Sequence, residues 1–505
     1  MENWNIAFAG SLSKAQNSRK QFFFREKLPD CARNIFRIYP HSNIQKLGVM
    51  MEKKSQGDEN YNVYSFCGSI VKIDNGYRMY YTMDVPDFSS MWIAVAESPD
   101  GLHWEEKHLG QWKDKKKYVN RIVFDNFTGN HNLIGQPQVV RDRNGNWLMY
   151  FWHHENGYRY TIAHSEDGLR WHVDNPPRWV FLDTWLNHRL NCQTQMINGW
   201  EPAGEGLSAE DKEKLWHYKS LRTNDASYVY FNEKENIYEY YAQWIVPAIP
   251  DRRVDADNYP YGHRYIQRRV SEDGYRWTPP ELIIVPDYKD PWDIQFYHLA
   301  VQWYEDWLIG SLGHYRVEED QQTQDMELVF SRDGRSWERP LRGGFIPRGK
   351  DGEYDSEGIY PPNAWIDEGI TWLCLYTGTT VKHKDATKDK DKVGSRIMAA
   401  RWPKNRFIGL AAGKVPGGFL SDIFVPQGNF ISIDANIRGW LKAELCDVFG
   451  RKITGYHLDD SIILKGDDTG HILRWGHNNT ASSFRYDAVR LRFEFQDAEI
   501  YGICF

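Results

Sequence analysis

The chain has few of the residues that build disulfide frameworks or metal centres. Six of its 505 residues are cysteines, and no two of them form a Cys-x-x-Cys pair. Its 17 histidines show neither His-x-x-x-His nor His-Glu-x-x-His spacing. We therefore predict buried free thiols, no metal ion and no cofactor. Gly-rich phosphate-binding loops and a Gly-x-Ser-x-Gly nucleophile motif are absent from the sequence as well.

Long apolar runs and blocks of like charge are also missing. No stretch reaches the ~20 consecutive apolar residues of a membrane-spanning helix, so we expect no membrane partner. Lysine and arginine total 62 and aspartate and glutamate 69, a net charge of −7 without basic blocks, so we expect no nucleic-acid partner. The start, Met-Glu-Asn-Trp, lacks the order of a signal peptide, which predicts a cytoplasmic protein unless a leader was removed. The sequence favours no oligomeric state.

Aromatic residues are abundant, at 15% of the chain, and some of them belong to a repeated turn. The pattern Ser-x-Asp-Gly-x-x-Trp occurs four times, each time after a run that reads as a β-strand. Its Ser and Asp side chains can accept hydrogen bonds from nearby backbone N–H groups, Gly can adopt a positive φ, and Trp can cover the turn. The four aspartates are Asp100, Asp167, Asp273 and Asp333.

More than the turn repeats, because three strand-like runs precede each copy. The runs comprise residues 66–73, 77–83 and 92–96; 136–141, 147–152 and 160–163; 227–231, 237–244 and 265–270; and 297–303, 307–312 and 326–330. A fifth unit keeps the layout without the heptapeptide, with runs at 361–366, 371–376 and 396–401. Four antiparallel strands in each of five units predict an all-β fold, a five-bladed β-propeller.

The remaining segments suggest the domain boundaries. After about residue 406 shorter alternating runs at 430–435, 440–448, 471–475, 489–495 and 500–505 predict a β-sandwich. We therefore expect an N-terminal segment at 1–58 that packs on or closes the propeller, a catalytic propeller at 59–405 and a sandwich domain at 406–505. Helical spacing at 208–221 predicts one short helix in an insertion.

A five-unit propeller with these turns, followed by a sandwich, resembles glycoside hydrolases of families 32 and 43, the invertase and arabinanase types. The resemblance covers about residues 61–505. It implies a glycosidase that cleaves a furanosyl-type or related sugar from an oligosaccharide or polysaccharide. The turn itself resembles the Asp-box of sialidases, which implies a structural hairpin away from the catalytic centre.

The chain departs from the family 32 pattern at the head of its first unit. Family 32 enzymes carry their nucleophile there in an Asn-Asp-Pro-type motif, whereas this chain has Tyr64-Ser65-Phe66-Cys67-Gly68-Ser69, which contains no carboxylate. We interpret the chain as a divergent member whose acids lie on other blades.

In a propeller the inner strands begin around a central funnel, so polar residues at those positions converge on one ligand. Glycoside hydrolysis needs one protonated carboxyl group and one ionised carboxylate. We predict Glu357 as general acid, Asp225 as nucleophile or base, and Asp293 as the group that orients the sugar, with Asp355 as the substitute for Glu357. The alternative for each is an aspartate or glutamate that caps a strand entry.

Neutral side chains at the same positions are candidate sugar ligands, by hydrogen bonding or by stacking, or else ordinary packing groups. They are Tyr64, His131, Gln136, Gln295, Tyr297 and His298. Two other functions stay open: a sialidase-like or mannoside-phosphorylase-like propeller enzyme, and a non-catalytic glycan-binding propeller whose acids point away from one another.

Overall fold

The computed structural model describes most of the chain. The ranges left undescribed are 1–18, 53–60, 86–89, 113–118, 142–143, 155–157, 176–178, 181–195, 198–200, 203–225, 248–261, 318–321, 384–393, 477, 479–480 and 485–486. The predicted nucleophile Asp225 and the predicted helix at 208–221 lie outside the described residues.

The described residues form an all-β protein. They contain no α-helix, and their short 3-10 turns include η1 (His41–Asn43) and η5 (Ser482–Phe484). In the part of the chain placed by the structure, no helix is long and apolar enough to cross a membrane. The hydrophobic residues therefore gather between sheets.

The first three repeat units each form a separate antiparallel sheet. The first contains β5 (Asn62–Ile73), β6 (Gly76–Asp84), β7 (Met91–Ser98) and β8 (Glu105–Glu106). The second contains β10 (Ile134–Arg141), β11 (Trp147–His154), β12 (Tyr158–Ser165) and β13 (Trp171–Val173), with β9 (Phe124–Asp125) and β14 (Trp179–Val180) at its margin. The third contains β17 (Ser227–Asn232), β18 (Ile237–Pro247), β19 (Gly262–Ser271) and β20 (Glu281–Ile284). A separate small pair is β15 (Met196–Ile197) and β16 (Glu201–Pro202).

The fourth and fifth units join in one nine-stranded sheet. The fourth supplies β21 (Ile294–Tyr304), β22 (Trp307–Arg316), β23 (Gln324–Ser331) and β24 (Trp337–Glu338). The fifth supplies β25 (Gly358–Tyr360), β26 (Trp365–Asp367), β27 (Thr371–Thr379) and β28 (Ser395–Pro403), and β4 (Gln45–Met51) pairs with β28. The single predicted run at 361–366 was wrong, because Pro361 and Pro362 have no N–H groups for a ladder and separate β25 from β26.

Each heptapeptide forms the turn that its residues predict. In the first copy the Ser98 hydroxyl accepts a hydrogen bond from the Gly101 N–H at 2.8 Å. The Asp100 carboxylate accepts two backbone N–H groups at 2.9 Å, and the Trp104 indole donates to the Gly101 carbonyl at 2.8 Å. Gly101 has a φ of +82°, which an L-residue rarely adopts.

These turns also connect neighbouring sheets. The Tyr80 hydroxyl of β6 donates to the Gly168 carbonyl of the second turn at 2.6 Å, and Tyr150 of β11 donates to Gly274 of the third at 2.7 Å. The first turn packs on the fifth unit, where a Cβ atom at Gly101 would lie 2.6 Å from Ile366 Cδ1. The first unit therefore contacts both the second and the fifth.

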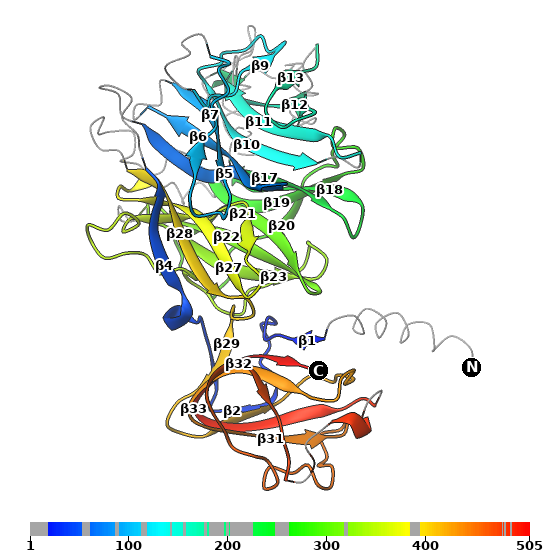
Figure 1. Ribbon diagram of the computed structural model, residues 1–505. Coiled ribbons are helices and arrows are strands. Elements are labelled where there is room, and N and C mark those ends of the chain that lie inside the picture. Colours follow the sequence, from blue (N-terminus) through cyan, green and yellow to red (C-terminus); the bar gives the residue numbers. More distant parts are fainter. Residues whose placement is uncertain are drawn as a thin grey trace.

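The terminal sheet combines both ends of the chain and lies at one end of the molecule (Figure 1). Its strands are β1 (Lys20–Gln21), β2 (Asp30–Arg33), β3 (Phe36–Ile38), β29 (Gly409–Ala412), β30 (Gly417–Leu420), β31 (Ser432–Cys446), β32 (Leu464–Ile472) and β33 (Arg490–Cys504). Its core is rich in phenylalanine and isoleucine, including Phe419, Phe493, Phe495 and Ile500.

The long strands β31 and β33 correct the sequence prediction for this region. Two separate strands at 430–435 and 440–448 were expected, as were two at 489–495 and 500–505, but each pair is one continuous strand of 15 residues. A shift of register between Ile437 and Trp440 absorbs the polar interruption at Arg438 and Gly439, so the ladder continues past it.

The N-terminal residues link the terminal sheet to the repeat units. Strands β1, β2 and β3 pair with the terminal sheet, whereas β4 pairs with β28 of the fifth unit. Between them, Phe24 stacks on Phe330 of β23 with ring centroids 3.9 Å apart. One segment thus packs against two sheets.

Candidate functional site

The first strands of successive units lie beside one another, and we call β5, β10, β17, β21 and β25 the inner strands. Strand β5 contacts β10, β10 contacts β17, and β17 contacts β21. Asn363, just after β25, donates its side-chain amide to the Gly68 carbonyl of β5. We call the starts of these strands the head end. The sequence predicts the candidate site residues at this end.

The head end carries unusual backbone geometry. Cys67 in the middle of β5, Gln136 near the start of β10 and Ala226 just before β17 have φ values of +51°, +54° and +55° although none is glycine. The ladders of β5, β10 and β21 each shift register near their starts. Strained residues and bulges of this kind concentrate at functional sites, where they re-aim side chains.

Gln138 of the second unit connects that unit to three others. Its side-chain amide donates to the Cys67 carbonyl at 2.5 Å, and its carbonyl oxygen accepts from the Asn363 amide at 2.9 Å and from the Val229 N–H at 3.4 Å. This buried amide has both donor and acceptor groups satisfied, so it fixes the inner strands relative to one another.

An aromatic cluster covers this layer. The Phe66 ring lies 5.0 Å from His298, 5.1 Å from Tyr360 and 5.8 Å from Tyr297, measured between ring centroids. Burial lowers the pKa of His298 to about 3, so its imidazole is neutral at physiological pH. The predicted sugar ligands Tyr297 and His298 are therefore largely buried in this cluster.

The other predicted neutral ligands have identifiable partners. Gln295 accepts hydrogen bonds from the Arg264 N–H at 3.0 Å and from its guanidinium at 2.7 Å. Gln136 accepts from the Tyr160 hydroxyl at 3.0 Å and from the Ala226 N–H at 3.1 Å, which joins β10 to β17. Both amides therefore connect neighbouring elements at the head end.

Tyr64 interacts electrostatically with Tyr360 of the aromatic cluster, whereas His131 contacts Phe127. Burial, with the nearby Asp84 carboxylate, raises the pKa of Tyr64 well above its ordinary value, so the phenol stays protonated. The His131 imidazole packs edge-on against Phe127 at 5.0 Å and approaches its carbonyl at 3.3 Å. The roles of Tyr64 and His131 as sugar ligands stay predictions.

The predicted acids occupy different surroundings. Asp293 is buried and pairs with the Arg316 Nε at 2.6 Å. Asp355 is also buried, and the same oxygen contacts Lys46 Nζ at 2.7 Å and the Tyr376 hydroxyl at 2.8 Å. Asp355 thus holds β4 against β27, which is a positioning role.

Glu357 is half-buried and differs from both aspartates. Within the described ranges, no hydrogen bond or ion pair reaches its carboxylate. Its backbone is fixed, because its N–H donates to the Thr379 carbonyl at 3.1 Å and its carbonyl accepts from the Gln324 N–H at 3.4 Å. A rigid backbone with a side chain available to a ligand suits a group that exchanges protons with a substrate.

The structure brings one further carboxyl group to this place that the sequence did not single out. Asp325, beside Gln324 at the start of β23, pairs with Arg348 at 3.0 Å. Arg348 also donates to the Ser356 carbonyl at 3.4 Å, next to Glu357. Burial raises the pKa of Asp325 despite this arginine. Asp325 lies at the start of the third strand of its unit. Because the candidate residues were predicted at the starts of the inner strands, Asp325 was not among them.

The acids of the fourth and fifth units thus share one region with arginines between them. Arg316, which holds Asp293, also lowers the pKa of Asp325 through its charge, although burial outweighs that effect. No group of three or more His, Cys, Asp or Glu side chains that could hold a metal ion occurs among the residues with described placement. The region can therefore offer carboxyl groups and guanidinium donors to a neutral or anionic ligand.

A polar hollow lies near the heptapeptide turns, at the ends of β12 and β19 opposite the head end. Its volume is about 440 Å³, and Glu166, His172 and Tyr275 line it. Tyr275 stacks on His164 with centroids 5.9 Å apart and shares a hydrogen bond with its ring. Its lining comes from turns whose side chains mainly bond to one another, so we do not assign the reaction to it.

Comparisons with known proteins gave no match to any family model and none to a curated protein. Among solved structures, one described as "Glycoside hydrolase" has 12% identity and a TM-score of 0.46, covering 72% of this chain and 93% of its own. An N-acetylgalactosamine deacetylase from F. plautii has 14% identity and a TM-score of 0.44, covering 72% and 97%. A β-1,2-mannobiose phosphorylase from Listeria innocua has 10% identity and a TM-score of 0.43, covering 74% and 97%. We therefore base the proposed function on the geometry of the described residues alone.

Proposed function

We propose that residues 59–405 form a five-bladed β-propeller, followed by a β-sandwich at 406–505, and that the propeller is a glycosidase. The observation that supports this function best is the carboxyl group of Glu357, held on a fixed backbone beside the Asp325–Arg348 pair. The strained residues in or beside three inner strands support a binding site at the same end of the sheets.

In the proposed reaction Glu357 donates a proton to the leaving glycosidic oxygen. Asp325 and Arg348 stand beside its backbone, and Asp293, held by Arg316, orients the sugar. A second, ionised carboxylate is needed as nucleophile or as base for water, and Asp225 is our candidate for it. The substrate is an oligosaccharide or polysaccharide with a furanosyl or related terminal sugar.

The test is hydrolysis of a panel of aryl glycosides by the purified protein and its Glu357→Gln variant. Loss of a general acid lowers kcat by about 10²–10⁴-fold on substrates with poor leaving groups. The loss is much smaller on dinitrophenyl glycosides, whose leaving groups need no proton. Glu235→Gln is the matched control, because Glu235 is exposed and lies in the turn between β17 and β18, at the opposite end of the inner strand from the site. Cleavage of no substrate, or full activity in Glu357→Gln, contradicts the proposal.

A phosphorylase is the second candidate, and the arginines favour it. Arg316 and Arg348 at the head end offer guanidinium donors suited to a phosphate oxyanion. The two candidates are distinguished by adding inorganic phosphate to the same assays: a phosphorylase releases a sugar 1-phosphate, whereas a hydrolase releases the free sugar. Tight oligosaccharide binding without either product indicates the glycan-binding alternative.

A further inference from the structure

The loop at 285–293, between β20 and β21, is fixed at its base by buried charges. Asp290 is only 1% exposed at its side chain and accepts two hydrogen bonds from Arg339, at 2.7 and 2.8 Å. Arg342 pairs with Asp287 at 2.7 Å. Within the loop, the Asp287 N–H donates to the Asp290 carboxylate at 2.9 Å. The loop therefore has one geometry rather than many.

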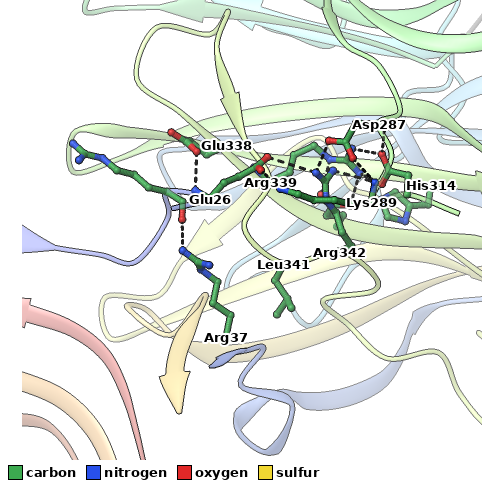
Figure 2. Close-up of polar contacts among 12 residues, drawn as sticks. Glu26, Arg37, Asp287, Lys289, His314, Glu338, Arg339, Leu341 and Arg342 are labelled. Atoms are coloured by element: carbon green, nitrogen blue, oxygen red, sulfur yellow. Dashed lines mark hydrogen bonds and ion pairs between the residues drawn. The ribbon is translucent and has the colours of Figure 1, made fainter. Parts of the chain in front are cut away.

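Other elements hold the same charges from outside the loop. Arg339 also binds both oxygens of the buried Glu327 of β23 at 2.8 Å, and His314 of β22 contacts Glu327 at 2.6 Å. Glu26, from the N-terminal segment, pairs with Lys289 at 2.5 Å. Figure 2 shows Glu26, Arg339, Arg342, Asp287 and Lys289 along one row of polar contacts. The loop is thus anchored to three separate parts of the chain.

The same loop leaves large apolar side chains in solvent. Tyr288 is 92% exposed and Trp292 is 64% exposed, with Val285 at the start of the loop 44% exposed. Burying side chains of this size is favourable, and the fold forgoes that gain here. A rigid loop that presents aromatic rings to water is typical of a binding surface.

Trp292 lies directly beside the candidate site. The next residue in the chain, Asp293, is buried and pairs with Arg316, whose side chain is 36% exposed. Apolar faces of sugar rings pack on aromatic rings while their hydroxyl groups take such donors. An exposed ring one residue along the chain from an acid that pairs with a partly exposed guanidinium therefore suits a saccharide.

We propose that Trp292 and Tyr288 form a stacking platform for the sugar units of the substrate that lie beyond the unit being cleaved. That one sugar unit of the substrate is cleaved at the candidate site rests on the proposed function. Each of the two aromatic side chains can bury ~150–250 Å² of surface in a contact. Together they offer less than the ~800 Å² that each partner buries in a stable protein interface. The platform therefore fits an oligosaccharide better than a protein partner.

The experiment compares long and short ligands in Trp292→Ala, Tyr288→Ala and the control Val285→Ala. Calorimetric titrations use gluco-, manno-, galacto- and arabino-oligosaccharides of increasing length, and kinetic assays use single-sugar aryl glycosides. We expect affinity for the longest bound oligosaccharide to fall about tenfold or more in Trp292→Ala, with kcat/KM on the single-sugar glycoside unchanged. Trp292→Phe should recover part of the affinity.

Three outcomes overturn the platform: equal losses for short and long ligands, no loss for either, or binding of no oligosaccharide by the native protein. If Trp292→Ala instead changes the sedimentation coefficient by dissociating an oligomer, the rings belong to a contact between copies. The titrations need no turnover. A native protein that binds long chains through Trp292 but cleaves none therefore keeps the platform and contradicts only the proposed function.

Discussion

Replacing Arg339 by methionine removes the centre of the buried charge network. The guanidinium makes four hydrogen bonds, two to Glu327 and two to Asp290, and the side chains of these acids are 0% and 1% exposed. The variant keeps a side chain of similar length, so little packing is lost. What it loses is the positive charge between two buried carboxylates.

The expected cost follows from that burial. Removing one partner of a buried ion pair costs about 3–5 kcal/mol, because the remaining charge stays desolvated without compensation. Arg335→Met is the matched control, since the Arg335 side chain is 59% exposed and its partner Glu281 is 44% exposed. Exposed pairs contribute about 0–1 kcal/mol, so the control should change stability little.

Urea unfolding at neutral pH, followed by circular dichroism and tryptophan fluorescence, measures both variants. A lower midpoint at an unchanged denaturant slope is expected for Arg339→Met. Adding Glu327→Gln to that variant should restore part of the loss, because it removes one uncompensated charge. A loss below about 1 kcal/mol in Arg339→Met, or an equal loss in Arg335→Met, refutes the reasoning.

Further predictions concern the titration of His298, the turn that contains Asp167 and the ion pair between Lys46 and Asp355. Because burial lowers the pKa of His298 from 6.5 to about 3, the unfolded chain binds more protons between these values. The contribution of His298 to the free energy of unfolding is therefore full above pH 6.5 and is lost as the pH falls toward 3. In His298→Gln, the free energy of unfolding measured by urea titration should depend less on pH in this range. Asp167→Ala removes the acceptor of two turn N–H groups and should cost about 1–2 kcal/mol by thermal unfolding, whereas the neighbouring Glu166→Ala should be neutral. Lys46→Met leaves the buried Asp355 without its cation and should cost about 1.5–3 kcal/mol, while Lys46→Arg should cost less; equal losses contradict the ion pair.

Much of the fold could be predicted from the sequence, because the patterns that indicate its turns and strands involve residues close together in the chain. The Asp100 turn is stabilised by hydrogen bonds among residues within three positions of one another, so its pattern predicts its geometry wherever it occurs. The strand runs of the first four units were placed within a few residues for the same reason. The errors fell where local signals mislead: at Pro361, which interrupts an apolar run, and at Arg438, where a shift of register carries the strand past polar residues.

The candidate site was only partly accessible. Glu357 stood out because two acids and a glycine precede a strand, and the structure leaves its carboxylate available to a ligand. Asp355 looked equivalent in the sequence, yet it binds Lys46, which lies 309 positions away. Asp325 carried no signal, because its significance depends on Arg348 and on the strand beside it.

The sequence by itself determined the all-β class, the repeated turns and the approximate places of most strands in the repeat units, since neighbours in the chain make those interactions. Only the tertiary structure decided which acids are neutralised, which are buried and which lie together. Those properties depend on charges and surfaces brought from distant segments, such as Glu26 beside Lys289 and Lys46 beside Asp355, and no local pattern encodes them.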